Sequence, residues 1–296
     1  MVAFDRDKTH DRMAIIDMLI FIIPLQSPKT SSNWERVSAL CLRTVYSCLG
    51  QSNSAFHVVL VCNERPLGLS EHERLSVVTV DYPVPAPNTK ARMQDKFRKL
   101  NMGMYHMRSH APCYFMPVDA DDCVHRGLAS VIAQDTQAHG WFMDQGYLHD
   151  EGSRVLYLQR RDFILRCGTS YIVRCTPEEI PNHPDADPDQ YFLTANGHSV
   201  IREACAQKGC PLRRLNIPGT VYVGATGEND SKFALKKWRS RRIFLSKLLN
   251  TRWLSPYKRR QYGLYPLSAC SRHQSQMKEK NTTTDVTDPA EGECTK

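Results

Sequence analysis

The sequence predicts an α/β fold with a mixed, mostly parallel central sheet flanked by helices. Short apolar runs, typical of buried strands, alternate with longer stretches of helical periodicity through the first half of the chain. The order strand, helix, strand over residues 18–80 matches a βαβ unit, whose crossover is right-handed. With 296 residues, the chain is long enough to bury a substantial core in one large domain.

The composition is that of a globular protein with reduced thiols. Apolar residues make up 41% of the chain and charged residues 24%, which excludes a disordered or fibrous protein. The eleven cysteines form neither a Cys-x-x-Cys pair nor a zinc-type array, so we expect buried free thiols and a cytoplasmic location. The apolar run 13–25 contains Asp17 and is shorter than the ~20 residues of a membrane span. We therefore expect it to contain the first core strand rather than a signal peptide.

The first half of the chain is predicted to hold four strands and two helices. The strands are expected over residues 18–25, 56–62, 77–80 and 113–118, and the helices from residue 34 and over 91–107. Ser32 and Glu35 have the spacing of a capping box at the start of the first helix. On the second helix, Lys96 and Lys99 lie beside an apolar stripe, either as a solvated face or as contacts to a phosphate.

The second half is predicted to contain shorter elements. We expect a helix over residues 126–137, strands over 141–147, 154–159, 171–174 and 221–223, and a helix over 190–207 that carries His198. The acidic, proline-rich loop 181–189 precedes this last helix.

An acidic triplet follows the fourth strand, in Val118-Asp119-Ala120-Asp121-Asp122. Side chains alternate along an extended backbone, so Asp119 and Asp121 are expected on one face. Two carboxylates at the carboxyl end of a parallel strand suit a magnesium or manganese ion that also binds phosphates. Asp122 is a weaker ligand candidate and could equally cap the following helix. The alternative for the whole triplet is an acidic turn without a ligand.

The net charge of +8 is concentrated in one segment. Residues 232–260 contain eleven Lys/Arg and no acid, so the remainder has 28 basic and 31 acidic residues. We predict a basic helical segment over 231–267, between a main domain over 18–230 and a disordered tail over 268–296, with a short extension over 1–17. The basic segment could be a solvated helix, a contact to an anionic membrane or a nucleic-acid contact.

These pieces resemble, in their order, nucleotide-sugar glycosyltransferases. The strand that ends in Pro24, the helix from Trp34 and the strand 56–62 resemble the opening of the GT-A fold. The middle of family 2 glycosyltransferases is similar to three further pieces: Asp95-Lys96 with Asn101 and Gly103, the Val118–Asp122 segment, and Gly168-Thr169-Ser170. The resemblance covers residues 18–175.

The resemblance implies a hexosyltransferase that moves a sugar from a nucleotide-diphosphate donor, with UDP-sugars favoured, to an acceptor hydroxyl with inversion. Asp119 and Asp121, joined by His198, would hold Mn²⁺ or Mg²⁺ against the donor phosphates. The other residues expected to bind the donor are Pro24, Asn63, Asp95, Lys96, Lys99, Asp119, Gly168 and Arg174. Residues 18–123 would form the nucleotide-sugar half and 124–230 the acceptor half.

The chain departs from the family pattern where a catalytic base is expected. No clear acidic motif precedes a basic helix motif, and chain order favours Asp187 and Asp189 as the catalytic residues. The alternative for both is a solvated acidic loop. Glu228, in a glycine-rich loop, is a further candidate for a metal or diphosphate contact.

Two other functions compete with this hypothesis. A nucleotidyltransferase needs a glycine-rich basic loop after its first strand, and residues 26–33 contain no glycine and a single cation, Lys29. The second alternative is a non-enzymatic protein that binds nucleic acid through residues 232–260, but no recognised nucleic-acid-binding motif accompanies this segment. We therefore expect a glycan or lipid-linked acceptor, a role in polysaccharide biosynthesis, and peripheral contact with the inner membrane face.

Overall fold

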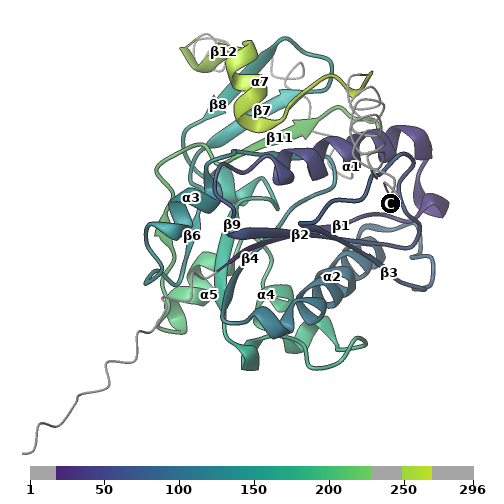
Figure 1. The fold of residues 1–296 in the computed structure, drawn as a ribbon, viewed down its shortest axis with the longest axis vertical. Coiled ribbons are helices and arrows are strands. Elements are labelled where there is room, and N and C mark those ends of the chain that lie inside the picture. The colour runs from purple at the N-terminus through teal and green to yellow at the C-terminus, as the bar shows by residue number, and fades with distance from the viewer. Residues whose placement is uncertain (1–17, 229–248, 269–296) are drawn as a thin grey trace, which may run out of the picture.

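The computed structural model describes residues 18–228 and 249–268, which form an α/β architecture of two mixed sheets flanked by helices (Figure 1). The larger sheet has seven strands in the order β10-β6-β9-β4-β1-β2-β3. Its strands are β1 (Leu19–Pro24), β2 (Phe56–Cys62), β3 (Leu75–Thr79), β4 (Cys113–Pro117), β6 (Gly140–Phe142), β9 (Tyr171–Cys175) and β10 (Arg213–Arg214). The arrangement is compatible with a Rossmann-like fold, as the α/β prediction requires.

The topology of the larger sheet creates a binding position at one edge. Strand β1 is completely buried and lies between β2 and β4, and it is parallel to both. The chain moves from β1 to β2 and β3 on one side, and then returns to β4 on the other side. The carboxyl ends of β1 and β4 therefore form a topological switch point, where open α/β sheets bind their ligands.

The second sheet is the main difference from the predicted architecture. It has five strands in the order β12-β8-β7-β11-β5, and only β7 and β11 in it are parallel. Its strands are β5 (Cys123–Val124), β7 (Gly146–Asp150), β8 (Val155–Gln159), β11 (Thr220–Gly224) and β12 (Thr251–Trp253). Of these strands, β8 and β11 were predicted and β7 was predicted in part, whereas β5 and β12 were not. The sequence did not indicate the second sheet, because apolar periodicity identifies a strand without identifying its neighbours.

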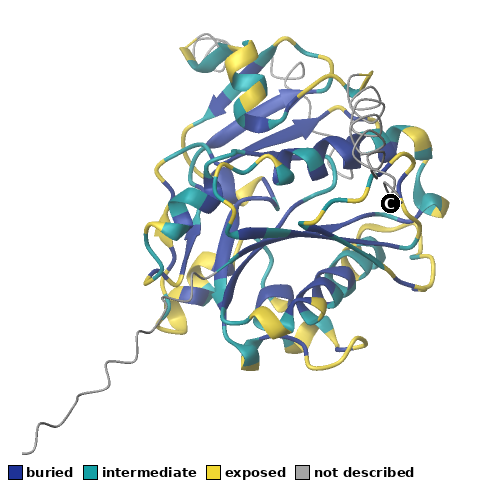
Figure 2. Cartoon of the chain, viewed as in Figure 1, coloured by how far each residue is buried: buried dark blue, intermediate teal, exposed yellow. Residues whose placement is uncertain are grey.

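Helix α1 (Trp34–Leu49) lies between the two sheets, and α2 (Thr89–His106) covers the opposite face of the larger sheet (Figures 1 and 2). Because both sheets pack against α1, ten of its sixteen residues are buried. The Ser47 hydroxyl of α1 donates to the carbonyls of Val124 and Tyr262. These hydrogen bonds join α1 to β5 of the second sheet and to helix α7 (Pro256–Tyr262). The close approach of α2 to β1 depends on Gly103, where a Cβ atom would lie 2.5 Å from Cγ2 of Ile22.

Three local predictions need correction. The first helix is capped by Asn33, whose side chain accepts a hydrogen bond from the Arg36 amide (2.9 Å), and not by Ser32. The helix predicted over 126–137 is shorter in the structure, where α3 spans Leu128–Ala133. The helix predicted over 190–207 is divided into α4 (Phe192–Ala195) and α5 (Ile201–Gln207). His198 lies between these two helices, directly after Gly197, a residue type that is unfavourable within a helix.

The basic segment predicted to be helical over 231–267 is only partly described. Residues 229–248 lie outside the described part, as do residues 1–17 and 269–296 of the predicted extension and tail. After them the chain forms β12, which pairs with β8, and α7 (Pro256–Tyr262). Thr251–Trp253 is therefore a strand at the edge of the second sheet, and the helical prediction was wrong for these residues.

The described residues contain nine cysteines, all of them free and eight of them buried, as the sequence led us to expect. Within residues 18–228 and 249–268, no helix combines the length and the apolar character that a membrane span requires.

The second sheet contains a histidine that should make folding stability depend on pH. His149 on β7 is buried, and its Nδ1 atom lies 3.0 Å from the Val155 carbonyl oxygen. Burial lowers the pKa of His149, and the Arg43 charge lowers it further against the effect of that hydrogen bond. In the unfolded chain the histidine pKa is about 6.5, so below this pH the unfolded chain binds more protons than the folded one. The folded state therefore loses stability as the pH falls below about 6.5.

We predict that replacing His149 with glutamine, which keeps an amide donor, reduces this pH dependence. Urea unfolding at pH 7.5 and 5.5 should show a smaller loss of unfolding free energy in the variant than in the wild type. The difference between the two has an upper limit of about 1.4 kcal/mol per pH unit below 6.5. Equal losses in both proteins would show that His149 does not titrate differently on folding.

Candidate active site

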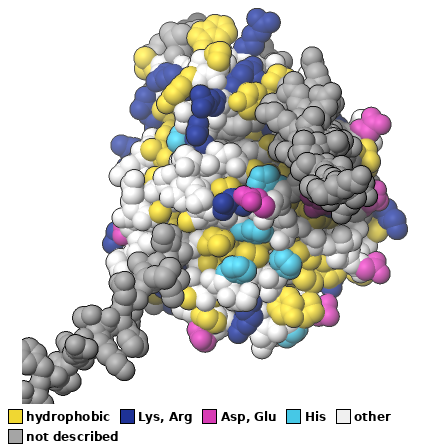
Figure 3. Space-filling view, viewed as in Figure 1, with side chains coloured by type: hydrophobic (Ala, Val, Ile, Leu, Met, Phe, Trp, Pro, Cys, Tyr) yellow, Lys and Arg dark blue, Asp and Glu magenta, His cyan; other side chains and the backbone are white. Residues whose placement is uncertain are grey.

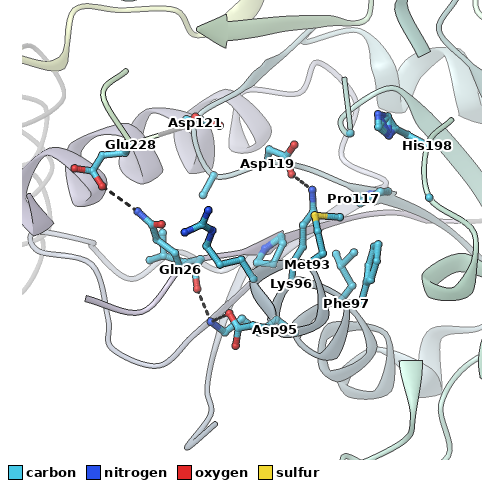
Figure 4. Close-up of a pocket in the computed structure, with 18 of the residues that line it drawn as sticks. Gln26, Met93, Asp95, Lys96, Phe97, Pro117, Asp119, Asp121, His198 and Glu228 are labelled. Carbon is cyan, nitrogen blue, oxygen red and sulfur yellow. Dashed lines mark hydrogen bonds and ion pairs between the residues drawn. The ribbon is translucent and has the colours of Figure 1, made fainter. Parts of the chain in front are cut away.

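A cavity of about 340 Å³ lies at the carboxyl ends of β1 and β4, at the topological switch point (Figure 4). Its volume is in the range of small-molecule sites. Pro24 closes β1 and Pro117 closes β4, and both line the cavity. The cavity also collects most of the residues predicted from the sequence: Pro24, Asp95, Lys96, Lys99, Asp119, Asp121, Gly168, His198 and Glu228.

An ion pair between Lys96 and Asp119 lies at the centre of the cavity (Figure 4). The Lys96 ammonium donates to Oδ1 of Asp119, and the two side chains are 24% and 29% exposed. Burial alone would lower the pKa of Lys96, but the charge of Asp119 and the hydrogen bond to it outweigh burial and raise the pKa. Lys96 is therefore charged, and both side chains are accessible to a ligand.

The ion pair leaves room only for a glycine at position 168. A Cβ atom at this position would lie 2.8 Å from Oδ2 of Asp119 and 3.1 Å from Nζ of Lys96. Any side chain here would displace the pair, so the small-residue segment Gly168-Thr169-Ser170 is needed for close packing at the site.

Asp121 provides a second carboxylate in the cavity wall. Burial, and after it the negative charge of Asp119, raise the pKa of Asp121 to about 7, against the opposing effect of Arg43. The two aspartates therefore produce a locally negative potential, which a bound cation would relieve.

Asp122 differs from its two neighbours because it is fully buried and does not line the cavity. Its Oδ2 accepts hydrogen bonds from the Thr169 hydroxyl (2.7 Å) and the Cys167 thiol (3.3 Å), and its Oδ1 accepts from the Val223 amide (3.0 Å). Burial and the charges of the other two aspartates raise its pKa well above the usual carboxyl value. Asp122 does not cap α3, which was one of the two alternatives for it, and instead joins three segments behind the site.

Lys99 has a structural position and not the predicted solvated or phosphate-facing one. Its side chain is fully buried, and its ammonium donates to the Leu25 carbonyl (2.8 Å) and to Oδ2 of Asp95 (2.7 Å). Burial lowers the pKa of Lys99 despite its contact with Asp95. Lys99 therefore ties α2 to the end of β1 and holds one wall of the cavity.

Glu228 and His198 stand at opposite ends of the cavity (Figure 4). The Glu228 carboxylate accepts from the Gln26 side chain (3.4 Å) and the Ser32 amide (3.2 Å), so the loop after β11 is bound to the loop after β1. Burial lowers the pKa of His198, and the nearby Lys96 charge lowers it further, so its ring is neutral at pH 7.

Four predicted site residues do not line this cavity: Asn63, Arg174, Asp187 and Asp189. The Asn63 amide donates to the carbonyls of Val80 (3.3 Å) and Tyr82 (3.1 Å), so its role there is structural. Arg174 lies within β9, opposite Tyr114 of β4. The two aspartates line an adjoining hollow of about 450 Å³, in which Asp187 accepts from the Asp189 amide (3.1 Å). The geometry therefore gives no support to Asp187 and Asp189 as the catalytic base.

Several cavity residues had no signal in the sequence. They are Gln26, Arg92, Arg166, Tyr171 and Tyr222. Gln26 belongs to a loop that was expected at this edge, but no motif distinguished it from its neighbours. Arg166 lies in the turn before Gly168, where neither periodicity nor a motif marks a cation.

The donor atoms in the cavity fit a magnesium or manganese ion. Residues 18–228 and 249–268 contain no group of three or more His, Cys, Asp or Glu side chains close enough to hold a metal, so His198 does not complete a ligand set with Asp119 and Asp121. However, Mg²⁺ commonly binds through one or two carboxylates and takes its remaining ligands from water and substrate phosphates. Two carboxylates beside an open cavity match that donor set.

Comparison with known proteins adds no family to this description. No protein-family model matches the chain, and no curated protein matches it significantly.

The contrasting positions of Asp121 and Asp122 give a direct test of the site. We predict that Asp122→Ala lowers the unfolding free energy by about 2–5 kcal/mol, because it leaves the Val223 amide and the Thr169 hydroxyl without their acceptor. Asp121→Ala, the matched substitution in the cavity wall, should cost about 1 kcal/mol or less. Urea denaturation measures both, and an equal cost in the two variants would contradict the assignment.

Proposed function

We propose that the protein is a glycosyltransferase with GT-A organisation, which transfers a sugar from a nucleotide-diphosphate donor to an acceptor hydroxyl with inversion. The observation that carries the proposal is the pairing of Asp119 and Asp121 beside Lys96 in a cavity at the β1–β4 switch point. Open α/β sheets bind their ligands at the carboxyl ends of their strands. The ordered resemblance of residues 18–175 to family 2 glycosyltransferases supports the choice of substrate class.

The charges in the cavity suit a diphosphate leaving group. Asp119 and Asp121 would hold Mn²⁺ or Mg²⁺, which would supply positive charge to the departing diphosphate. Lys96 and Arg166 add fixed cations to the same cavity. Preorganised charges of this type lower the barrier where negative charge develops in the transition state.

The remaining residues hold these charges in place. Gly168 permits the contact between Lys96 and Asp119, and Lys99 fixes the start of the β1–α1 loop. UDP-sugars are the favoured donors, and the acceptor would be a glycan or lipid-linked hydroxyl. The donor half of the reaction is thus supported by residues from three separate parts of the sequence, 96–99, 119–121 and 166–168.

The structure offers one argument against a nucleotidyltransferase. In such enzymes the loop after the first strand binds the triphosphate through glycine amides and cations. Here the equivalent loop is bound to the Glu228 carboxylate through Gln26 and Ser32. This carboxylate would repel a triphosphate at that position.

The proposal predicts nucleotide-sugar turnover that depends on both cavity carboxylates. With Mn²⁺ and a panel of nucleotide sugars, the full chain should release nucleoside diphosphate from at least one donor. Asp119→Asn and Asp121→Asn should each reduce that release by about 100-fold or more, because each removes a charged group at the leaving phosphates. A coupled assay for nucleoside diphosphate provides the measurement.

Asp81→Asn is the matched control, because Asp81 is exposed and does not line the cavity. It should keep wild-type turnover, and thermal melting should confirm that all three variants are folded. Full turnover in either cavity variant would rule out its proposed role as a metal ligand.

A further inference from the structure

Lys and Arg side chains gather with hydrophobic ones over β8, β12 and α7, at the top of the molecule in the view of Figure 3. We call this region the cationic surface and define it by residues 154–161 and 249–268, which are joined by the pairing of β8 with β12. These two stretches contain seven cations and no Asp or Glu: Arg154, Arg160, Arg161, Arg252, Lys258, Arg259 and Arg260.

Large apolar side chains are exposed on the same surface. Leu249, Trp253 and Tyr257 are 67%, 72% and 70% exposed, and Tyr265 is partly exposed as well. The described residues contain nine such exposed large hydrophobics, so four of the nine fall within a stretch of twenty residues. Clustered exposed apolar side chains, unlike scattered ones, mark interaction sites.

We propose that the cationic surface binds a lipid bilayer that contains anionic phospholipids. Tryptophan and tyrosine favour the headgroup level of a membrane, where the ring is partly desolvated and its polar atom stays hydrated. An exposed leucine beside them can enter the acyl boundary. The seven cations, with no acid among them, complement the negative surface potential of such a membrane.

The hydrogen bonds that two of these cations make within the protein favour a membrane over a nucleic acid as the binding partner. The Arg252 guanidinium donates to the carbonyls of Leu249 and Thr251, and the Lys258 ammonium donates to the Tyr147 hydroxyl. Because these cations already donate hydrogen bonds within the protein, they contribute a positive potential more readily than they form new ion pairs with a ligand. Attraction to an anionic membrane needs only the field, whereas nucleic-acid binding depends on direct phosphate contacts.

The cationic surface is connected to the cavity by side-chain contacts. The Arg160 Nε donates to Oδ1 of Asn250 (2.6 Å), and the Arg166 Nε donates to Oε1 of Gln159 (2.8 Å). Arg166 lines the cavity, so the surface begins at the cavity rim. Membrane binding would thus bring the cavity close to lipid-linked acceptors, a consequence that rests on the proposed function, whereas the binding itself does not.

Vesicle co-sedimentation of the full chain tests the proposal without any donor or acceptor. Binding should be strong to vesicles of phosphatidylcholine mixed with phosphatidylglycerol, weak to phosphatidylcholine alone, and reduced by added salt. The double variant Trp253→Ser/Tyr257→Ser should bind these vesicles with an affinity lower by about tenfold or more, because two interfacial anchors are lost. Arg260→Glu, which reverses an exposed charge, should also weaken binding about fivefold or more.

Two control variants separate this surface from general stickiness. Leu67→Ser removes another exposed hydrophobic side chain, and Lys90→Glu reverses another exposed charge. Both should bind mixed vesicles as the wild type does. Equal binding by the double variant, or no binding to mixed vesicles, would overturn the proposal. So would salt-sensitive binding of a single-stranded oligonucleotide that prevents vesicle binding and is lost in the same variants. That result would assign the surface to nucleic acid instead.

Discussion

The buried carboxyl group of Asp122 is the interaction on which the candidate site depends. It joins the turn after β4 to the segment before β9 through Thr169, and to the second sheet through Val223. The Thr169 hydroxyl also accepts a hydrogen bond from the Asp119 amide (2.9 Å), so the same network sets the backbone of the first cavity aspartate. Asp122 is also linked to α1 through its backbone carbonyl, which accepts a hydrogen bond from the Thr44 hydroxyl (2.7 Å). The carboxyl group and the backbone carbonyl of this one residue thus fix Asp119 relative to both sheets and to the helix between them.

The three adjacent aspartates show how neighbouring identical residues acquire different roles. Asp119 is paired with Lys96, Asp121 lines the cavity, and Asp122 is removed from solvent by its partners. Burial and mutual repulsion raise the pKa of Asp121 and Asp122, while the ammonium of Lys96 neutralises part of the charge of Asp119. The site can therefore hold three carboxyl groups within four positions because each has a different environment.

The sequence was informative where local patterns decide the structure. Buried strands such as β1 and β4 are continuous apolar runs, and the acids that follow β4 are placed at the sheet edge by topology alone. Asp119 and Asp121 could be predicted for this reason, and local motifs also indicated Lys96 and Gly168, although most of the residues that line the cavity were not predicted. Residues whose position depends on tertiary packing could not be predicted: Asp122 has the sequence signature of a cap, and the fully buried Lys99 has that of a surface cation.

The weakest predictions concerned the second half of the chain. Short strands from 140 to 224 belong to two different sheets, and no periodicity distinguishes them. Because the helix is interrupted at Gly197, His198 lies in a loop that lines the cavity, while Asp187 and Asp189 line the adjoining hollow. Chain order, which suggested these two aspartates as the base, gives no information about which face of α2 a later loop will reach.

The most direct test of the central claim is ligand-dependent thermal stability. A ligand that binds only the folded protein raises its melting temperature. The account predicts that a nucleoside diphosphate, UDP above the others, raises the melting temperature together with Mn²⁺ and raises it far less without the metal. In Asp119→Asn and Asp121→Asn the rise with Mn²⁺ should disappear. The account would be contradicted if no nucleoside diphosphate shifted the melting temperature with Mn²⁺, or if the shift persisted in both variants.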